Sequence, residues 1–239
     1  KRIEQDGGRA AVVPVDLSVP GEAEQMIEKA LEAFSHIDIL VNNAGVGHSV
    51  PVIDLDLESA RETFEINFWS LVAATQTLLP HLLARNTGQI INVSSIAGKR
   101  AFPGSSIYNA SKFAVEAFSE SLRVELYQTH IEVIDFCPSV TSTAFFDNPK
   151  VSRLWSKQEM SRYGLMAPEE VARKLVKASQ KGKRDVHLTL AGWLAVRLNP
   201  WMPGIFDRIA YRMRGEKVAG RLEQLRGYYL KEKRRNGQH

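Results

Sequence analysis

The sequence contains a single cysteine, Cys137, among its 239 residues. One thiol excludes an intrachain disulfide and offers no pair of thiolate ligands for a metal. The six histidines follow no HxxxH or comparable spacing, so no zinc site is expected either. These absences favour a reducing compartment, and we expect a cytoplasmic protein whose chemistry uses no metal.

Long apolar runs are also missing. A helix that crosses a bilayer needs roughly 18 or more apolar residues, whereas the nearest stretch, residues 188–202, is interrupted by Arg197, Asn199 and Pro200. The first nine residues are polar, have no signal-peptide character and do not begin with Met. We therefore expect no spanning segment and no leader in this sequence, and we expect the chain to lack its N-terminal part.

Short apolar segments alternate with amphipathic helical segments along most of the chain. With 44% hydrophobic residues, the chain is long enough for one domain with a sizeable core. Periodicity and turn signals predict strands at 11–15, 37–41, 89–93, 131–137 and 186–190, and helices at 22–34, 57–84, 108–127 and 168–180. This alternation predicts an α/β fold, a doubly wound parallel sheet with helices on both faces.

Tyr108 and Lys112 are four residues apart at the start of a predicted helix. Residues at this spacing share a helix face, so their side chains can serve one site. A nearby ammonium favours the ionised form of a phenol and lowers its pKa. Taken alone, this spacing is a weak pattern, and most of its occurrences are a packed tyrosine beside a solvated lysine.

Ser94 and Ser95 follow the predicted strand 89–93. Ligands of doubly wound sheets bind at the carboxyl ends of the strands, where a hydroxyl can hold a substrate oxygen. A serine pair at such a place is more often an ordinary turn.

Three motifs together resemble the short-chain dehydrogenase/reductase family: Asn42-Asn43-Ala44-Gly45, Ser95 thirteen residues before Tyr108, and Tyr108-x-x-x-Lys112. The resemblance covers about residues 11–190 in the family's order of elements. It implies a Rossmann-like, NAD(P)-binding domain over residues 1–192, with a substrate loop at 144–167 that is rich in aromatic residues. It also implies a homodimer or homotetramer.

The resemblance implies a catalytic set of four residues. Tyr108 would be the general acid in carbonyl reduction, and Ser95 would hydrogen-bond the substrate oxygen. Lys112 would bind the nicotinamide ribose and lower the pKa of Tyr108, and Asn67 would hold a water of the proton relay. Without the other motifs, Asn67 would be read as a helix amide with a local hydrogen bond.

The resemblance also implies the residues that contact the cofactor. Asn43, Ala44 and Gly45 would line it, although they could form a plain strand-to-helix turn. Asp16 and Leu17 would lie at the adenine ring, and Asp16 could equally be a helix cap. Thr141 and Thr143 would lie near the nicotinamide, on a segment where Ser139 replaces the family's usual glycine.

Family members begin with a strand, a Gly-rich turn that receives the pyrophosphate, a helix and a second strand. This sequence contains none of these, because Gly7-Gly8 lacks the G-x-x-x-G-x-G context. The resemblance therefore implies that the first two strands are missing from the chain and would lie between segments 11–15 and 37–41. The residue that selects NAD or NADP usually lies in that part, and we expect NADP(H) in preference to NAD(H).

Residues 193–239 form a C-terminal extension that we expect to be helical, with an apolar first half and a basic end. Residues 208–239 contain ten Lys or Arg and three Glu. Such a segment could lie on an anionic membrane surface, or its apolar part could close the substrate pocket or form a subunit contact. Nothing resembles a nucleic-acid recognition module, so no nucleic-acid partner is expected.

The sequence thus predicts an oxidoreductase that transfers a hydride between NADP(H) and a ketone or secondary alcohol. An apolar substrate is expected from the aromatic loop, with steroid-, retinoid- or lipid-like carbonyls as candidates. The alternative is a non-catalytic cofactor-binding or membrane-surface scaffold protein with the same fold.

Overall fold

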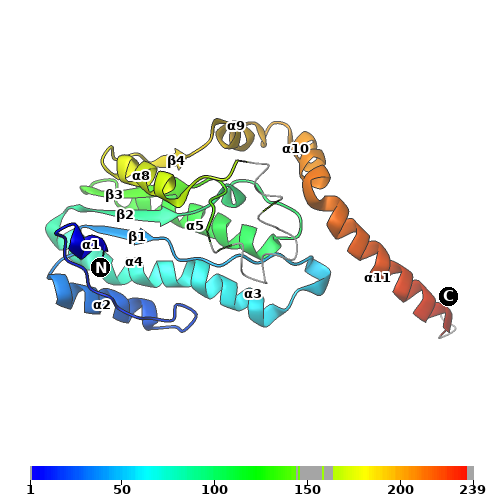
Figure 1. Cartoon of the computed structure of the whole chain (residues 1–239), viewed down its shortest axis with the longest axis horizontal. Coiled ribbons are helices and arrows are strands. Elements are labelled where there is room, and N and C mark those ends of the chain that lie inside the picture. The colour runs from blue at the N-terminus through cyan, green and yellow to red at the C-terminus, as the bar shows by residue number, and fades with distance from the viewer. Residues whose placement is uncertain (1, 144, 146–157, 159–163, 236–239) are drawn as a thin grey trace.

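The computed structural model describes residues 2–143, 145, 158 and 164–235. Its sheet has four parallel strands in the order β1-β2-β3-β4 (Figure 1). The strands are β1 (Ile39–Asn42), β2 (Gly88–Val93), β3 (Ile131–Cys137) and β4 (Asp185–His187). Short apolar runs in parallel order are typical of strands buried on both faces, and the predicted parallel α/β sheet is confirmed.

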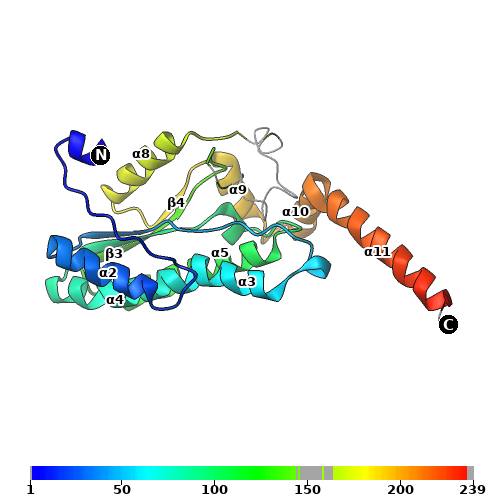
Figure 2. The ribbon, with the colours of Figure 1, turned by 60° about the horizontal axis from the view of Figure 1, so that its bottom comes forward.

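Helices cover both faces of the sheet (Figure 2). One face packs against α2 (Glu22–Phe34), α4 (Ser70–Arg85) and α5 (Ser106–Glu125), and the other against α8 (Pro168–Ser179). Each side has its own apolar core, the first built around Leu78, Leu82 and Ile90 and the second around Ile134 and Phe136. The sheet is therefore the central layer of three.

The predicted helix at 57–84 consists of three parts. Helix α3 (Leu57–Phe64) begins at Asp56, whose carboxylate accepts the Ser59 N–H at 2.9 Å. A π-helical turn (Glu65–Trp69) then leads into α4. Such turns insert one extra residue per turn and frequently occur at functional sites. Apolar periodicity does not reveal the insertion, because the same face stays buried on either side of it.

The predicted strand at 11–15 is wrong. Residues 8–16 are extended but pair with no strand in the described part of the chain, and the Val12 side chain is 87% exposed. An apolar segment becomes a strand only when a neighbouring backbone pairs with it, and no such neighbour lies beside it. The outer edge of β1 is correspondingly open, with Ile39 and Val41 exposed.

The C-terminal residues leave the sheet as a series of helices. These are α9 (Leu190–Leu198), α10 (Pro203–Ala210), a π-helical turn (Tyr211–Gly215) and α11 (Glu216–Arg235). Both views show α11 running away from the body of the molecule (Figures 1 and 2). The remaining short elements are α1 (Arg2–Gln5) and 3₁₀ turns at Val52–Asp54 and Ile96–Gly98. Strand β4 ends three residues earlier than predicted, because α9 already begins at Leu190.

Ion pairs between described residues join the C-terminal helices to the body of the molecule. Arg100 contacts Asp207 at 2.5 Å, and Arg221 donates two hydrogen bonds of 2.8 Å to Asp54. None of the helices described is both long and apolar enough to cross a membrane.

Candidate active site

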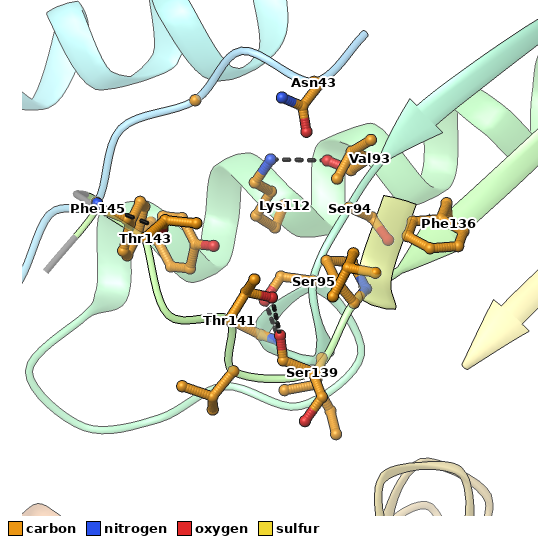
Figure 3. Close-up of a pocket in the computed structure, with 18 of the residues that line it drawn as sticks. Asn43, Val93, Ser94, Ser95, Lys112, Phe136, Ser139, Thr141, Thr143 and Phe145 are labelled. Atoms are coloured by element: carbon orange, nitrogen blue, oxygen red, sulfur yellow. Dashed lines mark hydrogen bonds between the residues drawn. The ribbon is translucent and has the colours of Figure 1, made fainter. Parts of the chain in front are cut away.

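The carboxyl ends of β1, β2 and β3 open into a cavity of about 780 Å³. Parallel strands all end at the same edge of a sheet, which brings distant motifs together there. Asn43, Ser95, Tyr108, Lys112 and Thr141 all line this cavity, although they are spread over about a hundred residues of sequence. Figure 3 shows the side chains that surround it.

Tyr108 lies in the first turn of α5 and is hydrogen-bonded to the Ser95 hydroxyl. Ser95 follows β2 and begins a 3₁₀ turn, where its Oγ accepts the Ala97 N–H at 3.2 Å. The ring of Phe145 lies beside that of Tyr108, with 5.8 Å between their centroids. The sequence therefore correctly predicted that the serine and the tyrosine would meet.

Burial raises the pKa of Tyr108 above its ordinary value, although the hydrogen bond from Ser95 acts in the opposite direction. Lys112 is not among the groups that shift it. The expected lowering of the Tyr108 pKa by Lys112 is therefore not seen in this chain by itself, because desolvation of the phenol dominates.

Lys112 is 5% exposed and donates a hydrogen bond of 2.9 Å from Nζ to the Val93 carbonyl oxygen (Figure 3). Burial lowers its pKa to about 8, while Asp135, Cys137 and Glu116 act in the opposite direction. An ammonium has three N–H donors. The Val93 carbonyl takes one of them, so the ammonium can donate to further oxygens in the cavity.

Asn67 lies in the π-helical turn and is 1% exposed. Its Oδ1 accepts the Val46 N–H at 2.7 Å, and its Nδ2 donates to the Val46 carbonyl at 2.9 Å and to Ser111 Oγ at 3.0 Å. Ser111 in turn donates to the Tyr108 carbonyl at 2.8 Å. Asn67 therefore joins the segment after β1 to the first turn of α5.

The segment after β1 runs along the cavity with Asn43 and Gly45 in its lining. Asn43 lies opposite the Lys112 ammonium (Figure 3). A Cβ on Gly45 would lie 3.3 Å from Asn67 Oδ1 and 3.4 Å from Lys112 Nζ, so glycine leaves the space above these two groups open. Ala44 is exposed and is not part of the lining.

Thr141 and Thr143 follow β3 and also line the cavity. Thr141 Oγ1 donates to the Ser139 carbonyl at 2.9 Å, and the Thr143 N–H donates to the Thr141 carbonyl at 2.9 Å. The Ser142 N–H donates to the Met166 carbonyl at 3.0 Å and the Met166 N–H donates to the Val140 carbonyl at 2.9 Å, which ties this segment to the chain that enters α8. Most of the predicted substrate loop at 144–167 lies outside the described residues, which include only 145, 158 and 164–167 of it.

Asp16 and Leu17 are not among the residues that line the cavity. The Asp16 carboxylate accepts hydrogen bonds from the backbone N–H of Ser18 at 2.9 Å and from its hydroxyl at 2.6 Å. Leu17 packs against the core beneath α2 and α4. The described contacts of Asp16 are those of a turn residue and not of a helix cap, since α2 is capped at Gly21.

Sequence reasoning missed a buried ionic cluster next to the site. Lys99 contacts Glu116 and lies 3.3 Å from Asp135, and the two carboxylate side chains are 7% and 1% exposed. Two signals could have revealed it. Asp135 interrupts an otherwise apolar strand, and Glu116 follows Lys112 by one helical turn on the buried face of α5.

Comparisons with known proteins agree with this geometry. The sequence model of the family described as short chain dehydrogenase matches residues 1–152. This chain belongs to the short-chain dehydrogenase/reductase family. The motifs that carried the resemblance lie within the matched range.

Individual relatives support the same assignment. The chain is 35% identical to dehydrogenase/reductase SDR family member 7B of Mus musculus, covering 86% of this chain and 65% of that protein. It is 33% identical to a 3-ketodihydrosphingosine reductase of Bacteroides thetaiotaomicron, covering 64% and 56%. The chain thus spans somewhat less than two thirds of the length of these relatives.

A solved structure shows the same fold. A short-chain dehydrogenase/reductase from Burkholderia phymatum, in complex with NAD, superposes with a TM-score of 0.76 at 24% identity, covering 85% of this chain and 79% of the other. This similarity confirms a Rossmann-like architecture of the NAD(P)-binding type.

Proposed function

We propose that the protein transfers a hydride between NADP(H) and a ketone or secondary alcohol at the site formed by Ser95, Tyr108 and Lys112. The observation that carries the proposal is the hydrogen bond between Tyr108 and Ser95 in a cavity that also contains the Lys112 ammonium. A scaffold protein that had lost catalysis would not need this combination of a phenol, a hydroxyl and a buried cation.

The residues present fit the nicotinamide end of the cofactor. Lys112 has donors for the ribose hydroxyls, and Gly45 leaves open the space beside Lys112 and Asn67. Asn43 and the Thr141–Thr143 segment offer polar groups on either side. When bound, the nicotinamide supplies or accepts the hydride.

The protein's own residues handle the substrate oxygen and the proton. The Ser95 hydroxyl donates a hydrogen bond to the oxygen on which negative charge develops. Tyr108 Oη donates the proton to that oxygen in reduction and removes it in oxidation. A charged Lys112 beside the phenol stabilises the phenolate that remains after reduction.

Apolar side chains dominate the remaining wall of the cavity. They are Ile96, Phe102, Phe136, Val140, Phe145, Val171, Leu175 and Val176. Such a wall favours a substrate whose carbonyl is attached to a hydrocarbon, because few polar groups are available to pair with other polar groups on it. We propose a steroid-, retinoid- or lipid-like carbonyl compound. The name of the Bacteroides relative, a 3-ketodihydrosphingosine reductase, is compatible with this class.

The test uses the protein encoded by the complete gene. Oxidation of NADPH and of NADH is followed with a panel of ketones that runs from short polar to long apolar chains. The proposal expects turnover that increases with chain length and a higher kcat/KM with NADPH. Cofactor binding without turnover of any ketone would favour the non-catalytic alternative.

We also propose that the C-terminal extension, residues 193–239, attaches the protein to anionic membrane surfaces. Exposed apolar side chains follow one another along α9, the turn after it and α10: Trp193, Leu194, Leu198, Trp201, Met202, Ile205 and Ile209. Ten basic residues follow between 208 and 239. Interfacial aromatic residues beside basic ones are typical of helices that lie in the headgroup region.

Substitution of two exposed residues tests this attachment. Trp201 is 84% exposed and Ile209 is 46% exposed, so Trp201→Ser with Ile209→Ser should leave folding intact. The wild type should sediment with phosphatidylserine vesicles at low salt, dissociate from them at high salt, and not bind phosphatidylcholine vesicles. The variant should remain in the supernatant with either kind of vesicle. Equal sedimentation of both would rule out this surface.

A further inference from the structure

The cluster of Lys99, Glu116 and Asp135 lies between three elements next to the active site. Lys99 follows the 3₁₀ turn after β2, Glu116 lies on α5, and Asp135 lies on β3. The proposed reaction uses none of the three. Burying carboxylates costs several kcal/mol each unless they are paired, so a cluster of this kind needs a compensating arrangement.

The charges of this cluster do not balance within it. Two carboxyl groups face the single ammonium of Lys99, which contacts both. None of their four oxygens accepts a hydrogen bond of normal geometry from a described residue. When both carboxyls are ionised, one negative charge is left over inside the protein.

Lys112 is the buried cation that can balance this charge. It precedes Glu116 by four residues on α5, so both side chains lie on the same helix face. The 3₁₀ turn packs directly on this part of the helix, since a Cβ on Gly98 would lie 2.6 Å from the Lys112 carbonyl and 3.1 Å from Glu116 Cγ. Asp135 and Glu116 both favour the charged form of Lys112.

We propose that Glu116 and Asp135, held by Lys99, are positioning residues that balance the charge of Lys112 and so keep its ammonium charged at the catalytic site. The effect on catalysis rests on the proposed function, whereas the effect on the charge of Lys112 does not. The titratable groups around Glu116 are Lys99, Lys112, Asp135, Cys137 on β3, and His187 on β4, which is half-buried beside them. Lys99 and Lys112 are the cations in this set that stay charged near neutral pH.

Burial and the neighbouring Asp135 carboxyl raise the pKa of Glu116 to about 8, against the influence of Lys99. Burial brings the pKa of Lys112 to about 8 as well. The two groups therefore titrate in the same pH range, where the loss of a proton from Glu116 supports the retention of one by Lys112.

Glu116→Gln tests the proposal, because it removes the charge and keeps the shape. The pKa of Lys112 is measured by NMR in protein with lysine labelled at Cε, with the signal assigned by Lys112→Arg. We expect the pKa of Lys112 to fall by about one unit in Glu116→Gln. Glu120→Gln is the matched control, since the Glu120 side chain is exposed to solvent and lies two helical turns from Lys112, so it should leave the Lys112 pKa unchanged.

A second variant and a kinetic readout complete the test. Asp135→Asn should lower the pKa of Lys112 in the same direction, so the result does not depend on the folding of one variant. Alcohol oxidation needs the Tyr108 phenolate, which a charged Lys112 stabilises, so kcat between about pH 7 and pH 8 should be lower in Glu116→Gln than in the wild type. An unchanged Lys112 pKa in either folded variant overturns the inference. If the Lys112 pKa shifts but the protein turns over no substrate, the inference about Glu116 and Asp135 stands and the proposed oxidoreductase function is wrong.

Discussion

Substitution of Asn67 by alanine should destabilise the protein, because this buried amide joins the segment after β1 to the first turn of α5. The amide makes three hydrogen bonds, two with the Val46 backbone at 2.7 and 2.9 Å and one with Ser111 Oγ at 3.0 Å. Each is worth about 1 kcal/mol net, and the Val46 groups left without partners add to the loss. We therefore expect Asn67→Ala to lower the free energy of unfolding by about 3 to 5 kcal/mol.

Asn67→Asp separates the two functions of the amide. Its carboxylate oxygens can still accept the Val46 N–H, but the Nδ2 donor to the Val46 carbonyl and to Ser111 Oγ is lost and a negative charge is buried, so we expect a loss of at least about 3 kcal/mol. Urea unfolding followed by tryptophan fluorescence measures both variants. Asn43→Ala is the control, because this exposed side chain should change stability by less than about 0.5 kcal/mol. A loss below about 1 kcal/mol for Asn67→Ala would show that these hydrogen bonds do not hold the segment after β1 to α5.

Three further predictions follow from packing and titration. Gly98→Ala should lower the free energy of unfolding by about 2 to 3 kcal/mol, because its Cβ would lie 2.6 Å from a backbone oxygen. The control is Gly220→Ala on α11, whose Cβ has no atom within 4 Å and which should not destabilise the protein. Thermal unfolding measures both variants. Cys137 is 3% exposed and burial raises the pKa of its thiol, so a thiol reagent at mildly alkaline pH should label it only after denaturation, and rapid labelling of the native protein would contradict this burial. Because the pKa of Glu116 is raised, the folded state between about pH 5 and pH 8 keeps a proton that the unfolded chain has lost. The free energy of unfolding of the wild type should therefore fall relative to that of Glu116→Gln as pH rises through this range. A difference between the two proteins that does not change with pH would argue against the raised pKa.

The order of elements could be read from the sequence because apolar strands and amphipathic helices leave different periods. Strand β3 and helices α2 and α8 lie at the predicted positions to within one residue. The strand predicted at 11–15 failed for a different reason. Strand formation depends on a partner backbone that local sequence does not reveal, and within the described residues nothing pairs with this segment.

The same distinction holds for the candidate site. Ser95, Tyr108 and Lys112 could be predicted because their spacing forms a motif, and parallel topology then brings them to one cavity. The ionic cluster of Lys99, Glu116 and Asp135 was missed, because its members come from three elements with no shared motif and only Asp135 and Glu116 leave a signal in the sequence. The raised pKa of Tyr108 also escaped sequence reasoning, since it depends on how completely the phenol is buried.

The kcat of ketone reduction by Tyr108→Phe shows directly whether Tyr108 gives its proton to the substrate. The variant keeps the ring, including its contact with Phe145 at 5.8 Å, and removes only the hydroxyl that exchanges a proton with the substrate. With cofactor binding and thermal stability like those of the wild type, kcat should fall by about 10² to 10⁴-fold. A variant that reduces the same ketone at a rate close to that of the wild type would show that Tyr108 is not the proton donor and that the site works in another way.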